Sequence, residues 1–141
     1  MLGESHHYGV TVSDLDDLLA FYVDILGMEE VNRVTHEGDA ISKITGVEGT
    51  KMEILFLEAG GIGVELLQYH NPGGENANEG VRNCDVGSAH FCLEVEDVGR
   101  LHAELKEEVE FINPPQELSG GARVAYLYDP DGNVVELYQR G

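Results

Sequence analysis

The sequence has no tryptophan, only two cysteines and no long apolar run. Two cysteines, Cys84 and Cys92, cannot build the multi-bridge framework of a small secreted domain. No uninterrupted apolar stretch approaches the roughly 18 residues that a membrane-spanning helix needs. The first seven residues have neither the basic start nor the apolar stretch of a signal peptide. We therefore expect a cytoplasmic protein of ordinary globular composition.

Positive charge is also scarce. Eight Lys and Arg residues stand against 27 Asp and Glu residues, which gives a formal net charge of −19. Such a surface repels nucleic acid and anionic lipid, so we expect neither nucleic acid nor a membrane as a partner. The acidic residues are spread along the chain rather than collected in a tail. Because self-repulsion on this scale destabilises a compact state unless salt screens it, we predict a halophilic protein from a salt-rich cytosol.

The chain contains two copies of one sequence module. The block His7–Leu15 reappears in outline as His90–Val98, since in each a His is followed by Val at +5, Asp at +7 and an aliphatic residue at +8. A second block, Val64–Gln68, reappears as Val135–Gln139 with Glu and Gln at the same positions. The order His block, Glu block, His block, Glu block indicates a duplicated unit. Between the copies, residues 71–80 have the composition of a linker.

Each copy has the pattern of a βαβββ module. The His block alternates apolar and polar residues as a strand does. In the first copy a helix is predicted to follow, because Asp14 can cap it and Gly27 can end it. The apolar stripe of this helix, at helical spacing, is Leu15, Leu18, Leu19, Tyr22, Ile25 and Leu26. In the second copy a weaker stripe predicts a helix over Asp97–Glu108.

Three short strands complete each copy. They are predicted at Glu29–Thr35, Met52–Glu58 and Gly63–Tyr69, and then at Glu110–Asn113, Ala122–Tyr128 and Asn133–Gln139. The segment Asp129–Asn133 has the composition of a hairpin turn. We predict an α+β fold in a single domain over residues 1–141, with module one at about residues 5–70, a linker at about 71–87 and module two at about 88–140.

Two glutamates occupy mid-strand positions in which a carboxylate needs a partner. Strand alternation places Glu65 and Glu136 on faces that otherwise carry apolar and aromatic groups, where an unpaired carboxylate is costly. Neither copy has a Lys or Arg at a matching position, whereas each has a His, His7 and His90, at the same place in its first strand. A lone strand Glu or His usually has no special role, but here both recur in both copies. We therefore predict a divalent cation held by two imidazoles and two carboxylates.

Other histidines fit this repeat less well. His6 lies one position off the spacing that relates His7 to His90, so we do not assign it as a ligand. Three further histidines have no repeat partner and are expected on the surface: His36, His70 and His102.

Three segments also resemble a known family. They are His7–Leu15, Phe21–Met28 and Asp129–Leu137, and they are similar to the vicinal-oxygen-chelate superfamily, which includes glyoxalase I, methylmalonyl-CoA epimerase, extradiol ring-cleaving dioxygenases and the fosfomycin and bleomycin resistance proteins. The resemblance implies two tandem βαβββ modules that form a concave mixed sheet around a metal site. Carried over by motif, the metal ligands are His7, Glu65, His90 and Glu136. The resemblance leaves open whether one chain or a homodimer builds the site, and we expect a homodimer.

The resemblance implies a metal-dependent lyase or isomerase of the glyoxalase I or methylmalonyl-CoA epimerase kind, which transfers a proton next to a metal-bound carbonyl of a small-molecule substrate. Four protein ligands leave room for substrate only in an octahedral or expanded site, which favours Ni, Co, Mn or Fe, or Zn in expanded geometry. The resemblance gives the role of base to Glu136 or Glu65, and Glu48 is a weaker match for an epimerase base.

Departures from the family pattern keep other activities open. The chain has no Trp and no obvious cationic cluster, so neither glutathione nor coenzyme A is assigned as a substrate carrier. One alternative is an extradiol ring-cleaving dioxygenase, although Glu65 would occupy a position that oxygen chemistry leaves open. The other is a metal-free small-molecule binding or resistance protein, although such proteins commonly lack the four ligands present here.

Overall fold

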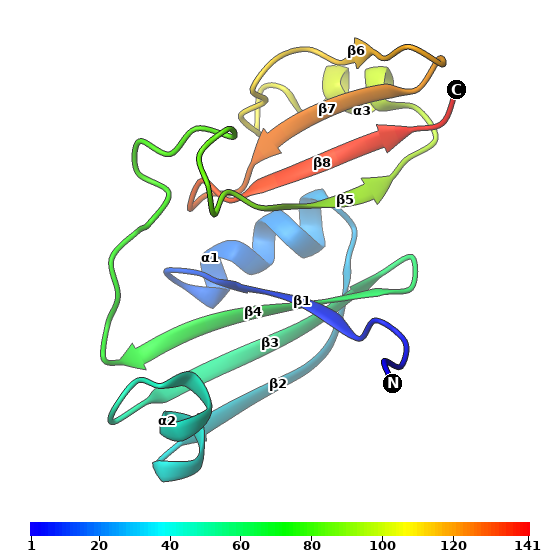
Figure 1. Cartoon of the computed structure of the whole chain (residues 1–141). Helices are drawn as coiled ribbons and strands as arrows, with labels where there is room; N and C mark the ends of the chain where they lie inside the picture. Colours follow the sequence, from blue (N-terminus) through cyan, green and yellow to red (C-terminus); the bar gives the residue numbers. More distant parts are fainter. The chain divides into compact units, whose positions relative to one another are not determined.

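The structure is a computed structural model that describes residues 1–141. The chain divides into two compact units, Met1–Asn76 and Ala77–Gly141, and each contains a four-stranded mixed sheet with helices beside it (Figure 1). The predicted α+β class and the repeated strand–helix–three-strand pattern are confirmed. No helix is long and apolar enough to cross a membrane.

The first unit has the strand order β1-β4-β3-β2, in which β1 and β4 are parallel and the other neighbours are antiparallel. Its core lies between α1 and the sheet, where Leu15 and Leu18 of the helix and Leu55, Val64 and Leu66 of the sheet are fully buried. In chain order its elements are β1 (His7–Thr11), α1 (Leu15–Leu19), the π-helix η1 (Ala20–Ile25), β2 (Glu29–Glu37), α2 (Asp39–Thr45), β3 (Lys51–Ala59) and β4 (Ile62–Asn71).

The second unit repeats this arrangement with the strand order β5-β8-β7-β6, and β5 is parallel to β8. Val98 of its helix packs with Leu127 and Val135 of its sheet, and all three are fully buried. Its elements are β5 (His90–Glu94), α3 (Val98–Leu105), β6 (Gln116–Glu117), β7 (Arg123–Tyr128) and β8 (Val134–Gln139). The predicted turn at residues 129–133 is present, because the Asp129 carboxylate accepts the backbone N–H groups of Asp131 and Asn133.

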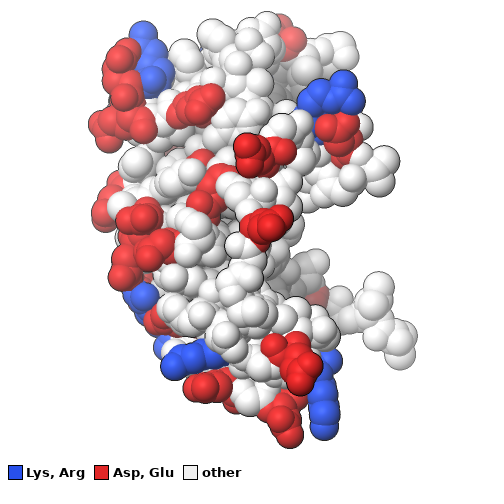
Figure 2. All heavy atoms as spheres, turned by 90° about the vertical axis from the view of Figure 1, so that its left-hand side faces the viewer, with Lys and Arg blue, Asp and Glu red and all other residues white.

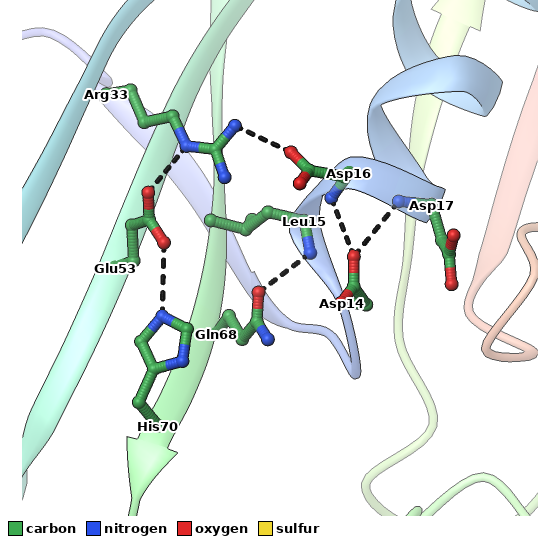
Figure 3. Close-up of polar contacts among 8 residues, drawn as sticks. All are labelled: Asp14, Leu15, Asp16, Asp17, Arg33, Glu53, Gln68 and His70. Carbon is green, nitrogen blue, oxygen red and sulfur yellow. Dashed lines mark hydrogen bonds and ion pairs between the residues drawn. The ribbon is translucent and has the colours of Figure 1, made fainter.

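The helices α1 and α3 begin in the same way. The Asp14 carboxylate caps α1 by accepting the N–H groups of Asp16 and Asp17, and Asp97 caps α3 by accepting that of Arg100. A glutamine side chain on the last strand of each unit accepts the first helical N–H: Gln68 Oε1 accepts from Leu15 at 2.9 Å (Figure 3), and Gln139 Oε1 accepts from Val98 at 3.0 Å. The Gln of each Glu block therefore fixes its helix to its sheet.

The helix of the first unit departs from the predicted apolar stripe. After Leu19 it continues as a π-helix, and the Leu26 N–H donates to the Phe21 carbonyl five residues earlier. The wider turn moves the buried face, so that Phe21 is buried beside Tyr22 while Ile25 is only partly buried. Gly27 ends the helix as predicted, with a positive φ of 76°.

Three elements differ from the prediction. No strand forms over Glu110–Asn113, where only Phe111 makes an isolated bridge, to Leu127, and the edge strand of the second sheet is the short β6 instead. The helix predicted to end at Glu108 ends at Leu105. The helix α2 was not predicted at all, because its seven residues are too few to show a helical period.

Each sheet has one face covered by its helix and an opposite face that we call the open face. In the first sheet the open-face positions are His7, Gly9, Thr11, Glu29, Asn32, Val34, His36, Met52, Ile54, Phe56, Glu58, Gly63, Glu65, Leu67 and Tyr69. In the second they are His90, Cys92, Glu94, Val124, Tyr126, Tyr128, Val134, Glu136 and Tyr138. Residues between them on β3, β4, β7 and β8, such as Leu55 and Leu137, are buried on the helix side.

An ion-pair network crosses the helix side of the first sheet. Arg33 of the exposed edge strand β2 donates to Glu53 at 2.6 Å and to Asp16 of α1 at 2.8 Å, and His70 Nε2 lies 3.1 Å from the second oxygen of Glu53 (Figure 3). Hydrogen bonds from Arg33 first, and then from His70, hold the pKa of Glu53 below its ordinary value near 4.5. The network thus ties the edge strand to both the sheet and the helix.

Replacing Glu53 by Gln is expected to lower the free energy of unfolding by about 1 kcal/mol at neutral pH. A carboxylate whose pKa is lowered on folding stabilises the protein fully above its unfolded pKa, and this contribution disappears as pH falls through the folded value. In urea unfolding, the difference between wild type and Glu53→Gln should therefore shrink below about pH 4. Glu104→Gln, which breaks the exposed Arg100–Glu104 pair with the same change in charge, is the control. An equal cost for both variants at pH 7 would contradict the prediction.

Acidic side chains are scattered over the surface with few basic ones between them (Figure 2). We expect the melting temperature to rise by about 10 °C between low and molar KCl, equivalent to roughly 3 kcal/mol for a chain of this length, because salt screens the repulsion among these acids. Thermal melts across a KCl series measure this directly. A flat or falling melting temperature would exclude the halophilic interpretation.

Candidate functional site

A His and a Glu meet on the open face of the first sheet. His7 Nε2 lies 3.2 Å from a carboxylate oxygen of Glu65, whose side chain is 22% exposed. The parallel pairing of β1 and β4 sets Gly9 opposite Glu65 and His7 opposite Gly63. A Cβ atom on Gly63 would lie only 2.6 Å from the Phe56 ring and 2.8 Å from the His6 carbonyl oxygen. Glycine at position 63 therefore gives the Phe56 ring and the first strand the space to pack beside the pair.

The second sheet carries an equivalent pair. His90 Nε2 lies 2.9 Å from a carboxylate oxygen of Glu136, whose side chain is 17% exposed. Here β5 and β8 pair in the same register, with Cys92 opposite Glu136 and His90 opposite Val134. In both sheets, then, the His stands two residues before the strand position that faces the Glu. The two halves of the sequence repeat build the same local geometry.

The surroundings of the two pairs differ. In the first, Glu65 is paired across the sheet with Phe56, whereas in the second Glu136 is paired with Tyr126, whose hydroxyl lies 3.3 Å from His90 Nε2. Burial, followed by the charge of Glu136, raises the pKa of Tyr126. The second pair therefore has a protonated phenol beside it where the first has an apolar ring.

Cys92 is the other side chain that distinguishes the second pair. It takes the place that Gly9 occupies in the first sheet. Burial and then the nearby Glu136 carboxylate raise the pKa of its thiol, which favours the neutral form. Comparing the two copies position by position would have found both Tyr126 and Cys92, because each replaces an unreactive residue at a repeat position next to a candidate ligand.

The remaining histidines are distributed over both units. His6 Nδ1 lies 2.7 Å from His7 Nδ1, so His6 is next to the first pair although the repeat left it out. His70 belongs to the ion-pair network on the helix side, and the His102 ring packs edge-on against Phe111 with centroids 4.7 Å apart. Glu48, the weaker candidate base, is exposed in the loop after α2.

The donor chemistry of the pairs suits a divalent ion. Each pair combines an imidazole with a carboxylate, and both are ligand types that Ni, Co, Mn, Fe and Zn accept. Within each unit these two side chains are the only predicted ligands that meet, and neither pair forms part of a group of three His, Cys, Asp or Glu residues suited to a metal. One pair alone therefore provides two donors, and the four-ligand set of His7, Glu65, His90 and Glu136 stays a prediction.

The duplicated fold agrees with what comparison with known proteins finds. Residues 4–137 match the model of the Glyoxalase/Bleomycin resistance protein/Dioxygenase superfamily, and the chain belongs to this superfamily. It is similar to a 2-epi-5-epi-valiolone epimerase of Actinomyces sp., with 28% identity over 94% of this chain and 76% of the epimerase. It is also similar to a lactoylglutathione lyase of Arabidopsis thaliana, with 27% identity over 96% of this chain but only 44% of the longer plant protein.

A solved structure shows the same fold. A glyoxalase family protein from Bacillus cereus superposes with a TM-score of 0.88 at 20% identity, covering 100% of this chain and 97% of the other. The predicted resemblance to the vicinal-oxygen-chelate superfamily is thus confirmed at the level of family and fold.

Proposed function

We propose that the protein is a metal-dependent enzyme that transfers a proton at a carbon next to a carbonyl group, as a lyase or isomerase. The observation that carries the proposal is the repeated His–Glu pair, because each unit sets the same two donors on the same open-face positions. Its relatives include proteins named as an epimerase and as a lyase, which supports this reaction class.

In this proposal the two modules act as one domain with a single site, built within one chain or across a homodimer. His7, Glu65, His90 and Glu136 would hold a divalent ion, with Ni, Co, Mn, Fe and Zn as candidates. Such an ion supplies a Lewis acid for the substrate carbonyl, which acidifies the neighbouring C–H bond. A free carboxylate is too weak a base for such carbon acids near neutral pH without this help.

The chain's own residues supply the remaining functions. A glutamate, Glu136 or Glu65, accepts the proton and returns it to the same or a neighbouring atom. We favour Glu136, because it is paired across the sheet with Tyr126 and lies beside the Cys92 thiol, two protic groups that can exchange a proton with it, whereas Glu65 is paired with Phe56. The apolar and aromatic side chains around both carboxylates limit the access of water to the proton being moved.

Deuterium exchange tests the proposed reaction. Metal-loaded protein in D₂O is expected to wash deuterium into the carbon beside the carbonyl of a suitable substrate, such as the hemithioacetal of methylglyoxal and a small uncharged thiol. Proton NMR or mass spectrometry follows the exchange, with chelated protein as the control. Oxygen uptake with catechols and no exchange on any carbonyl compound would favour the dioxygenase alternative. Binding of a ligand that stays unchanged would favour the sequestering alternative.

A further inference from the structure

Basic side chains are missing from the open faces. None of the strand positions that make up the open face of either sheet is a Lys or an Arg. Besides their glutamates and histidines, these positions carry mainly apolar and aromatic side chains, including Phe56 and Tyr69 in the first unit and Tyr126 in the second. A chain with only eight basic residues has placed none of them on the strand positions beside its candidate ligands.

The arginines of the sheets are used elsewhere. Arg33 is held on the helix side by Glu53 and Asp16. Arg123 pairs across the sheet with Gln139, a helix-side position, and its guanidinium lies against Gly99 of α3. Neither guanidinium can serve a ligand on the open face.

Arg140 is the one Lys or Arg that engages an open-face residue, and it is already paired with a carboxylate. Its Nε and one terminal nitrogen donate to the two carboxylate oxygens of Glu94, at 2.7 and 2.8 Å. This bidentate pair also holds the pKa of Glu94 below its usual value. Because Glu94 neutralises Arg140, the second open face offers no uncompensated positive side chain.

The charge balance at the site follows from these placements. If the proposed function holds, the two carboxylates Glu65 and Glu136 balance a divalent ion and leave no surplus positive charge. The chain as a whole has a formal net charge of −19, so its surface adds a strongly negative field. An anionic ligand would therefore be repelled on approach, and its charged group would find no unpaired Lys or Arg on either open face to replace its lost hydration. An uncharged ligand meets neither penalty.

We propose that the substrate is an uncharged carbonyl compound carrying an apolar or aromatic group, and that anionic carriers such as carboxylated or phosphorylated thiols are rejected. That the substrate has a carbonyl group rests on the proposed function. That it is uncharged and carries an apolar or aromatic group rests on the side chains of the two open faces. The proposal limits the substrates to those that can bind without a Lys or Arg side chain.

A matched pair of ligands tests the charge preference. 2-Hydroxyacetophenone and its ring 4-carboxylate share the same adjacent carbonyl and hydroxyl oxygens and differ by one remote charge. In saturation-transfer NMR titrations of the full chain, the carboxylate is expected to bind at least about tenfold more weakly in about 0.1 M KCl. The difference should narrow in about 1 M KCl, where the screening length falls to about 3 Å.

Two variants of equal charge change locate the effect. Glu94→Gln frees Arg140 beside the open face and is expected to strengthen binding of the carboxylate about fivefold without changing that of the neutral ketone. Glu104→Gln frees Arg100 on α3 in the same way and is expected to change neither by more than about twofold. Adding Arg140→Gln to Glu94→Gln should cancel the gain, and thermal melts of each variant check that it is folded.

Equal binding of the two ligands by the wild type, tighter binding of the carboxylate, or binding of neither would overturn the proposal. An equal gain from Glu94→Gln and Glu104→Gln would do the same, because it would reflect net charge rather than the open face. Saturation transfer needs neither turnover nor bound metal. A failure of deuterium exchange would therefore count against the proposed function alone, separately from this preference.

Discussion

Glu136→Gln is expected to lose deuterium exchange by about 100-fold to 10,000-fold while keeping most of its metal, the size of effect usual when a general base is removed. The amide oxygen of Gln can still coordinate a cation, but it cannot accept a proton at neutral pH. Exchange per bound metal ion, from NMR and elemental analysis of the same sample, is the quantity to compare. The Glu136 side chain is 17% exposed, and its carboxylate oxygen lies 2.9 Å from His90 Nε2.

Two further variants make this result specific. Glu65→Gln applies the same change to the equivalent carboxylate in the first unit, and it should lose less exchange per metal ion than Glu136→Gln. Glu104→Gln applies it on α3, away from both pairs, and should leave exchange within about twofold of wild type. If Glu65→Gln loses exchange and Glu136→Gln keeps it, the base is Glu65. If both keep it, neither glutamate is the base.

Loss of metal is the second large effect that we expect. As purified, the protein should carry about one divalent ion per pair of modules, and His90→Ala or Glu136→Ala should release it. Removal of a group that only supports a ligand typically lowers metal affinity about 10-fold to 100-fold, so removal of a ligand itself should cost at least about 100-fold. Elemental analysis after gel filtration, with and without chelator, measures the ion content.

His36→Ala and His102→Ala are the matched controls, because these histidines have no counterpart in the repeat. Both variants should keep the ion, even if His102→Ala melts earlier through loss of its ring contact with Phe111. A wild-type protein that is empty as purified and stays empty after incubation with Ni, Co, Mn and Zn would contradict the metal site. The metal-free binding protein would then be the better interpretation.

Most of the fold could be predicted because the two copies support each other. The His blocks and Glu blocks fix the first and last strands of each unit, and period-two alternation gives their buried faces, as Leu66 and Leu137 confirm. The elements that failed are those without a second copy or a full period. Helix α2 has no counterpart in the second unit, and Glu110–Asn113 has the apolar composition of a strand but pairs only through Phe111.

The π-helix shows a different limit of sequence reasoning. Leu19, Tyr22 and Ile25 keep the spacing of an ordinary helix, so a periodicity argument counts all three toward the core. A single wide turn after Leu19 shifts the phase and buries Phe21. The Phe21 and Tyr22 rings meet edge to face with centroids 5.0 Å apart, and both are buried, which the spacing of apolar residues alone does not indicate.

The sequence predicts the four candidate ligands but not the residues that surround them. Duplication identified His7, Glu65, His90 and Glu136, and the structure brings these together as one pair in each unit. It could not reveal that His6 touches His7, because that contact arises where β1 begins rather than within the repeat. The duplication also could not reveal the ion pair between Glu94 and Arg140, because the two residues come from different blocks.

The glutamine that joins each helix to its sheet has a mechanical consequence. Gln68 and Gln139 each stand three residues after the candidate carboxylate of the same strand, and each accepts the first amide of its helix. A fluctuation that frays the start of the helix must therefore break a bond to the strand that holds Glu65 or Glu136. The helix and that strand consequently open and close as one cooperative segment, so the rigidity of the carboxylate is set partly on the opposite side of the sheet.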